Sequence, residues 1–295
     1  MAKRSAGLSE FEREERRQQD RERLQRAAEE LLCSEGWARW LRVRAMFHSY
    51  SAGNCMLLAL QCHERGIVPE RVAGFRTWLK LGRCVRRGEK ALRILAPVSV
   101  KERDAAGEET GERRVFFKTA SVFELSQTEP LPGVEAVALQ APCEPLTGDS
   151  HAHLLAPLGA FAQSLGYAVC FETIDGSAGG WCDPKNKRIV VDANMPANAQ
   201  LRTLIHECAH ALGIDYQQYS RAQAEVMVDT VTLLAASSVG LQVDGETIPY
   251  VAGWGEDGAL AAVTEFAATI DRIARRIEDV LVASSDHTPA GVAAG

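Results

Sequence analysis

Apolar positions recur along this chain with two different spacings, and each spacing predicts a different kind of element. A spacing of three to four residues predicts helices at 9–33, 37–47, 151–164, 199–213, 221–234 and 257–283, and a further helix that begins at Ser51 or Asn54 and runs through Leu60. Short runs rich in β-branched and aromatic residues predict strands at 91–100, 113–124, 167–173 and 188–191. This mixture predicts an α+β fold.

A segment rich in proline and glycine divides the chain. Residues 129–148 contain four prolines and two glycines, a composition typical of a linker. We therefore predict two domains. The first, residues 1–128, has N-terminal helices followed by a small antiparallel sheet. The second covers residues 149–283 and is followed by a disordered tail, residues 284–295.

Composition narrows the class of protein. The 295 residues are 46% hydrophobic and 24% charged, as in ordinary globular proteins, and the length favours two domains. Because no run approaches eighteen apolar residues and the start lacks an apolar signal segment, we expect no membrane span and no secretion signal. The eight cysteines form no C-x-x-C pair, so reduced thiols in a cytoplasmic protein are expected.

The net charge of −6 conceals a strong asymmetry between the two halves. Residues 1–125 hold 25 Lys and Arg against 18 Asp and Glu, whereas the remainder holds 8 basic and 21 acidic residues. A positive half suits a polyanion and a negative half repels one. We therefore expect the two halves to have different partners.

The most specific motif is His206-Glu207-Cys208-Ala209-His210, an H-E-x-x-H pattern inside the helix predicted at 199–213. Residues four apart share a helix face, so both imidazoles can reach one Zn²⁺ at about 2.0–2.1 Å. Glu207 is placed to take a proton from a metal-bound water, whose pKa falls to about 7 in such sites. The pattern predicts a hydrolytic zinc site with Glu207 as general base. Cys208 faces away and is expected to be buried.

The next predicted helix offers a third ligand. Glu225 and Asp229 are four residues apart and share a face. We take Glu225 as the third zinc ligand and Asp229 as the carboxylate that orients a histidine through its ring N–H, although the spacing allows the roles to be exchanged. The fourth position would stay open for water, as catalytic zinc requires. Strand 188–191 is expected to form the rim along which an extended peptide lies.

A basic segment in the first half is a candidate nucleic-acid surface. Residues 71–93 hold eight basic residues and a single acid, Glu89, with Phe75 and Trp78 between them. Cations attract phosphates, and aromatic rings can stack on unpaired bases. Because no base-reading motif is present, single strands with little sequence preference are the expected partner. The alternative is that the aromatic rings lie in the core and the cations form a solvated face.

Several pieces of the chain, from about residue 24 to 283, resemble ArdC-type antirestriction proteins. In the first half these are Phe47–Asn54, Gly74–Trp78, Gly82–Pro97 and Val122–Thr128; in the second they are the His206 motif, the Glu225 helix and Pro249–Trp254. With Tyr50 and Asn54 from the first piece, the candidate DNA-binding residues are Tyr50, Asn54, Phe75, Arg76, Trp78, Lys80, Arg83, Arg86, Arg87 and Lys90.

The resemblance implies a single-stranded-DNA-binding domain followed by a zincin-like metallopeptidase domain that shields incoming plasmid or phage DNA from restriction. Family members often carry Glu-Ala-Glu where this chain reads Met227-Val228-Asp229, so the acid at 229 is shortened. The second half also resembles the ImmA/IrrE type, which implies a protein substrate.

Three functions follow as hypotheses. The first is a cytoplasmic protein that binds single-stranded DNA and carries a zinc peptidase site formed by His206, His210, Glu225 and Glu207. The second is a non-enzymatic protein that coats single strands and uses zinc to stabilise its fold. The third is a regulator that cleaves repressors.

Overall fold

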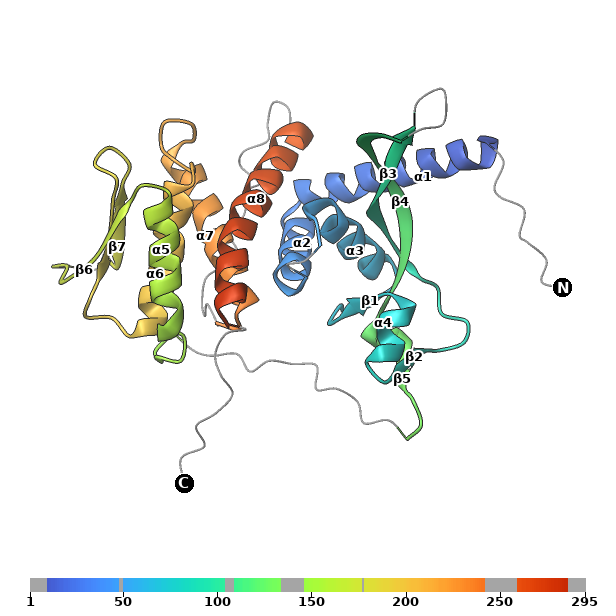
Figure 1. Cartoon of the computed structure of the whole chain (residues 1–295), viewed down its shortest axis with the longest axis horizontal. Helices are drawn as coiled ribbons and strands as arrows, with labels where there is room; N and C mark the ends of the chain where they lie inside the picture. The colour runs from blue at the N-terminus through green and yellow to red at the C-terminus, as the bar shows by residue number, and fades with distance from the viewer. Residues whose placement is uncertain are drawn as a thin grey trace. The chain divides into compact units, whose positions relative to one another are not determined.

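The computed structural model describes residues 10–47, 50–103, 109–133, 146–176, 178–241 and 259–285. The chain forms two compact units, and each is built from two stretches of sequence (Figure 1). Unit 1 consists of Met1–Glu30 and Gly53–Ala138, and unit 2 consists of Leu31–Ala52 and Leu139–Gly295. Helices and small sheets occur in both units, so the α+β class predicted from the sequence is confirmed.

Unit 1 combines helices with two small antiparallel sheets. Its helices are α1 (Glu10–Glu29), α3 (Ala52–Glu64), α4 (Phe75–Lys80) and the short η2 (Leu125–Gln127). Its strands are β1 (Val72–Ala73), β2 (Arg83–Val85), β3 (Leu92–Arg103), β4 (Glu109–Glu124) and β5 (Thr128–Pro130). The order is β1-β4-β3 in one sheet and β2-β5 in the other. The two long strands predicted at 91–100 and 113–124 are β3 and β4, and both are longer than predicted.

The outer edge of β3 is paired with side chains instead of a strand. The amide of Asn54 donates to the carbonyl of Leu95 at 2.9 Å and accepts from its N–H at 2.8 Å. Two turns further along α3, the amide of Gln61 donates to the carbonyl of Arg93 and accepts from its N–H, both at 2.9 Å. Two amides on one face of α3 thus satisfy alternate residues of β3, as a neighbouring strand would.

Replacing Asn54 with leucine should lower the free energy of unfolding by about 1–3 kcal/mol, because the backbone groups of Leu95 then lose their partners. Urea denaturation measures the change. The control is His63→Leu, an exposed position on the same helix. If the two variants are equally stable, the side-chain pairing of β3 does not contribute to stability.

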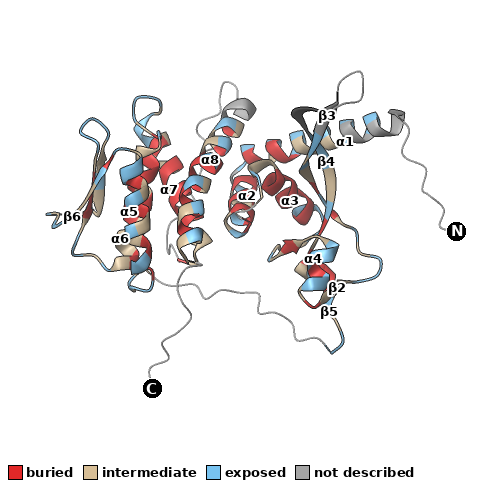
Figure 2. Ribbon diagram, viewed as in Figure 1, coloured by how far each residue is buried: buried red, intermediate tan, exposed pale blue. Residues whose placement is uncertain are grey.

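Unit 2 packs helices against a three-stranded sheet. Its helical elements are η1 (Glu30–Leu32), α2 (Ser34–Met46), η3 (Ala152–Leu154), α5 (Leu155–Ser164), α6 (Ala197–Ala211), α7 (Arg221–Ser238) and α8 (Ala259–Ser285). Its strands are β6 (Ala168–Glu172), β7 (Gly180–Asp183) and β8 (Arg188–Asp192), in the order β6-β8-β7. Buried residues follow α7 over most of its length (Figure 2). The core therefore lies largely among the helices and extends to β8, whose Ile189, Val190 and Val191 are buried.

The helix α2 belongs to unit 2, which corrects the division of the sequence at residue 128. Trp37, Trp40 and Leu41 are almost completely buried. Arg44, on the same helix, has no exposed surface and binds Glu278 of α8 through both terminal nitrogens, at 2.9 and 2.8 Å. The sequence pattern identified the helix but not its partner, which lies more than 200 residues away. The predicted linker lies largely outside the described residues.

The sheet of unit 2 differs from the expectation in one respect that matters for the site. The strands predicted at 167–173 and 188–191 are present as β6 and β8, but β8 is the central strand and cannot form a rim. β7, which the sequence analysis did not predict, is one of the two edge strands and runs antiparallel to β8. The expected rim at 188–191 is therefore wrong, because β8 has a neighbouring strand on each side.

None of the helices in the described ranges combines the length and apolar character that crossing a bilayer requires.

Candidate metal centre

The two histidines of the H-E-x-x-H motif lie on one face of α6. The opposite face carries residues without exposed surface, among them Leu201, Leu204 and Ile205, so the orientation of the helix is set by its packing. Cys208 is also fully buried, as predicted. The helix ends at Ala211, and Gly213 adopts a φ of +109°, a left-handed conformation that glycine tolerates best. The chain turns there toward α7.

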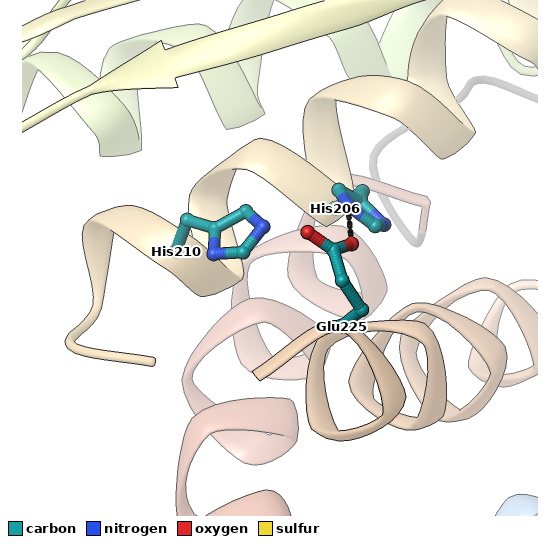
Figure 3. Close-up of side chains that lie close together, drawn as sticks. All are labelled: His206, His210 and Glu225. Carbon is teal, nitrogen blue, oxygen red and sulfur yellow. Dashed lines mark ion pairs between the residues drawn. The ribbon is translucent and has the colours of Figure 1, made fainter. Parts of the chain in front are cut away.

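His206, His210 and Glu225 come together as a group that could hold a metal ion. One ligand atom from each lies within 4.8 Å of the others. Figure 3 shows the Glu225 side chain extending from α7 toward the two rings of α6, with its Oε2 3.6 Å from Nε2 of His206. Two imidazoles and one carboxylate form a donor set of catalytic zinc sites, and ligand atoms around a tetrahedral ion lie about 3.4 Å apart. The residues therefore fit a divalent metal.

Each histidine has a second neighbour at its Nδ1 atom, and for His210 this neighbour is a hydrogen-bond partner. The Nδ1 of His210 lies 2.8 Å from the carbonyl oxygen of Ile214, which assigns the proton to Nδ1 and leaves Nε2 with a free lone pair. Asp229 Oδ1 lies 3.2 Å from Nδ1 of His206, although the direction is not that of a hydrogen bond. Of the two assignments that the spacing allowed, the structure places Glu225 with the rings as third donor and Asp229 behind His206.

Glu207 lies beside the group and is 6% exposed. Burial, the largest cause, raises the pKa of its carboxyl to about 7, and the negative charge of Glu225 adds to the shift while His206 opposes it. A carboxyl with a pKa near neutrality can both accept and return a proton at neutral pH. This is the property that a general base in a hydrolytic site needs.

The loop between α6 and α7 contributes a residue that the sequence analysis missed. The hydroxyl of Tyr216 donates to Oε1 of Glu225 at 2.5 Å, and its ring centroid lies 5.5 Å from that of His210. Burial and the hydrogen bond to Glu225 raise the pKa of Tyr216 to about 12, so the hydroxyl stays protonated as a donor. Tyr216 has no regular spacing to the motif, and no pattern in the sequence could have identified it.

A cavity of about 670 Å³ opens beside this group. Its walls include all four residues of β7, the loop residue Tyr216, and His206, Glu207, His210 and Glu225. β7 lies close to α6 because Gly180 has no side chain: a Cβ there would lie 2.6 Å from Cγ2 of Thr203 and 2.6 Å from the carbonyl oxygen of Val190. The edge strand and the metal-binding group thus face the same space.

The structure divides the ten candidate DNA-binding residues into several groups. Trp78 has no exposed surface and its Nε1 donates to the carbonyl of Phe123, so the alternative reading of this ring as core is the right one. The side-chain amide of Asn54 is engaged in hydrogen bonds to the backbone of Leu95 in β3. Both are corrected to structural roles. Tyr50 belongs to unit 2, whereas the other nine candidates belong to unit 1.

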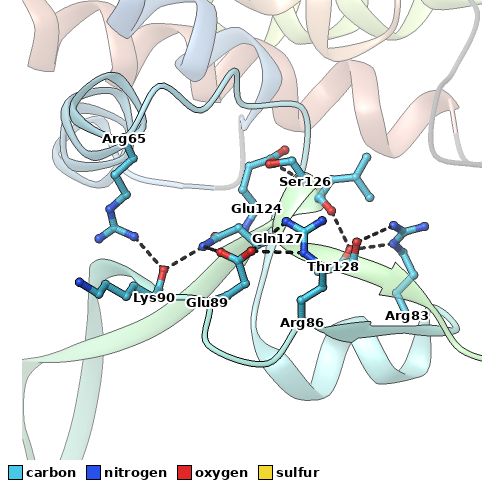
Figure 4. A network of polar contacts seen from close by, with 10 residues as sticks. Arg65, Arg83, Arg86, Glu89, Lys90, Glu124, Ser126, Gln127 and Thr128 are labelled. Carbon is cyan, nitrogen blue, oxygen red and sulfur yellow. Dashed lines mark hydrogen bonds and ion pairs between the residues drawn. The ribbon is translucent and has the colours of Figure 1, made fainter.

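Two arginines of the basic segment are held by contacts within unit 1 (Figure 4). Arg83 donates to the hydroxyl of Thr128 at 2.8 Å, and Arg86 binds Glu89 at 2.8 Å. Glu89 also accepts from Gln127 at 3.1 Å. Arg86 is nevertheless exposed, and the other exposed candidates are Phe75, Arg76, Lys80, Arg87 and Lys90.

The resembling piece Val122–Thr128 has a structural role in the same network. Glu124 has no exposed surface, and its carboxylate accepts from the backbone of Glu70 at 2.9 Å and of Ser126 at 2.6 Å. Gln127 completes a capping box with Glu124. Pro249–Trp254, the last resembling piece, lies outside the described residues.

Comparison with known proteins gives a match for one domain and a similar fold for the whole chain. Residues 15–123 match the N-terminal domain of the anti-restriction factor ArdC. The metal-free crystal structure of the antirestriction protein ArdC from the R388 plasmid superposes with a TM-score of 0.55 and 20% identity, covering 90% of this chain and 98% of that one. The Mn(II)-bound structure of the same plasmid protein gives 0.49 and 19%, covering 90% and 99%. Among curated proteins, none is a significant match.

Proposed function

We propose that this chain is a zinc-dependent peptidase joined to a domain that binds single-stranded DNA. Its residues 15–123 match the N-terminal domain of the ArdC family, and its fold is that of an ArdC antirestriction protein. In this role it protects incoming mobile-element DNA from restriction. The metal site lies in unit 2 and the basic segment in unit 1, so each activity has its own unit.

A single arrangement supports the peptidase proposal. Two imidazoles, one carboxylate and a buried acid with a raised pKa lie along one cavity. Bound there, zinc would supply a polarised water and a positive charge near the scissile carbonyl. His206, His210 and Glu225 would hold the ion. Glu207 would take the proton of the attacking water and pass it to the leaving amine.

The edge strand favours an extended polypeptide as substrate. β7 pairs with β8 on one side only, and its residues line the cavity that also contains Glu207. An extended peptide can add to such an edge through backbone hydrogen bonds, which place successive carbonyls along the strand. A site that only stabilised the fold would need no cavity of this size beside an edge strand, so the catalytic reading is favoured over a structural metal.

Purified protein should contain about one zinc per chain, and His210→Ala should lose most of it, because two remaining ligands bind a divalent ion far more weakly than three. Metal content by elemental analysis and zinc titration measure the effect. The control is His153→Ala, which removes an exposed histidine that bonds only the backbone of Ser150 in this structure. Equal metal content in both variants would remove the basis of the proposal.

The DNA-binding part of the proposal rests on the exposed face of α4. Phe75, Arg76, Leu79 and Lys80 are exposed, whereas Trp78 of the same helix points into the core. The face thus combines an aromatic ring, which is 49% exposed, with two cations and no acid. Rings stack on unpaired bases and cations neutralise phosphates, so this face suits a single strand without sequence preference.

Replacing Arg76 and Lys80 together with alanine should weaken binding of a single-stranded oligonucleotide and reduce its salt dependence. The slope of log affinity against log salt should fall by about 1.4, since each lost phosphate contact contributes about 0.7. A gel-shift salt titration of the full chain measures the slope. The full chain is required because a fragment ending at 128 would lose the partner of α2.

The matched control removes two exposed cations from unit 2, Arg272→Ala with Arg276→Ala. An unchanged slope in the α4 variant, or an equal loss in the control, would show that α4 is only a solvated surface. In either case the peptidase proposal stands, because it depends on unit 2 alone.

A further inference from the structure

The two carboxylate oxygens of Glu225 have different partners. Oε2 lies 3.6 Å from Nε2 of His206. Oε1 accepts the hydrogen bond of Tyr216 at 2.5 Å. The carboxylate therefore has Oε2 beside His206, while Oε1 accepts a hydrogen bond from Tyr216. A carboxylate without such a partner can offer both of its oxygens to a cation.

We propose that Tyr216 is a positioning residue of the metal site, which holds Glu225 so that only Oε2 is offered as a ligand. This inference rests on the proposed function, since it assumes that the group binds a metal. One-oxygen ligation gives three protein ligands and leaves the remaining position for water, as catalytic zinc sites require. Ligation by both oxygens would occupy that position.

The backbone of the loop that carries Tyr216 is held by its own hydrogen bonds. Asp215 accepts from the backbone N–H groups of Gln217 and Gln218 at 2.9 and 3.0 Å, and its carbonyl accepts from Tyr219 at 3.2 Å. These bonds close a tight turn around Tyr216. The place at which the Tyr216 side chain leaves the backbone therefore does not depend on Glu225.

The ring of Tyr216 has two neighbours, His210 and Arg221. Its centroid lies 5.5 Å from that of His210, and the guanidinium carbon of Arg221 lies 5.9 Å from it. Arg221 is the first residue of α7, the helix that also carries Glu225. Tyr216 thus contacts one metal-binding histidine through its ring and the carboxylate through its hydroxyl, and it links the two helices that supply the ligands.

Removing the hydroxyl should weaken metal binding without removing a ligand. Tyr216→Phe should bind Zn²⁺ about 10–100-fold more weakly than the wild type, the usual effect of losing a residue that orients a ligand. Competition with a chromophoric chelator measures the affinity, with no enzyme assay. The matched control is Tyr219→Phe, a hydroxyl on the same loop whose ring packs against Phe266. Thermal melting of the metal-free variants confirms that each is folded.

Cobalt(II) reports the coordination directly, because four-coordinate Co²⁺ absorbs visible light far more strongly than five- or six-coordinate Co²⁺. Wild type and Tyr219→Phe should give the strong spectrum, and Tyr216→Phe a weaker one as Glu225 turns both oxygens to the ion. In a Glu225→Ala background, Tyr216→Phe should change the affinity no further, since its action passes through Glu225.

Unchanged affinity in Tyr216→Phe overturns the inference, and so does a further loss in the Glu225→Ala background. Neither result touches the proposed function as long as the wild type binds one metal per chain. A wild type that binds no metal contradicts the proposed function itself, and the inference with it.

Discussion

Glu207→Gln is expected to lower the rate of zinc-dependent peptide cleavage by about 10²–10⁴-fold, the usual contribution of a general base. Glutamine keeps the size of the side chain but cannot accept a proton. Because Glu207 is not one of the three ligand residues, the variant should retain the metal content of the wild type. A fluorescent unfolded protein, offered with and without a single-stranded oligonucleotide, provides the assay.

The burial of Glu207 sharpens this test. Glu207 is 6% exposed and the pKa of its carboxyl is raised to about 7, so the metal-free protein has to keep a poorly hydrated acid in the wall of the cavity. The neutral amide removes that cost, and Glu207→Gln should therefore be at least as stable as the wild type toward denaturant. Loss of activity could then not be ascribed to unfolding.

The control is Glu265→Gln, an exposed glutamate on α8 that should cleave like the wild type. Full cleavage by Glu207→Gln would disprove the mechanism. If neither the wild type nor the control cuts any protein, although both bind zinc, the protein belongs instead to the non-enzymatic class of the second hypothesis.

Arg44→Met should destabilise unit 2 by about 3–5 kcal/mol, the usual cost of removing one partner from a buried ion pair. Arg44 has no exposed surface, and it binds Asp271 at 2.5 Å as well as both oxygens of Glu278. Burial alone would lower the pKa of Arg44, but the hydrogen bonds and charges of the two acids outweigh it and raise the pKa. Without the guanidinium, Glu278 is a buried charge with no counter-charge there.

Urea denaturation measures this loss. Arg42→Met, an exposed arginine on the same helix, is the control and should change stability by less than about 0.5 kcal/mol. Combining Arg44→Met with Glu278→Leu should recover part of the stability, since the buried carboxylate is then gone as well. If Arg44→Met is as stable as Arg42→Met, the buried network does not hold α2 in unit 2.

The candidate metal ligands show how far local spacing reaches. The four-residue period of an α-helix puts His206 and His210 on one face whatever the helix packs against, so the sequence could predict both. The same period put Glu225 and Asp229 together, but it could not distinguish their roles. That distinction depends on how α7 approaches α6, which places Glu225 beside the ring nitrogens and Asp229 behind His206.

The basic segment shows the opposite case. Charge and aromatic content singled out residues 71–93, yet composition does not say which side of a short helix is buried. Trp78 and Phe75 are three residues apart on α4, and one is fully buried while the other is half exposed. Arg83 and Arg86 are engaged within unit 1, which the sequence could not show.

The sequence by itself determined what depends on neighbours along the chain: the α+β class, most helices and strands, the two histidines on one face and the buried Cys208. Only the tertiary structure decided what depends on distant segments: β7 as an edge strand, α2 as part of unit 2, the amides that pair with β3, and the hydroxyl of Tyr216 on Glu225. Hydrophobic periodicity records that a face is buried, but it carries no information on which segment covers it.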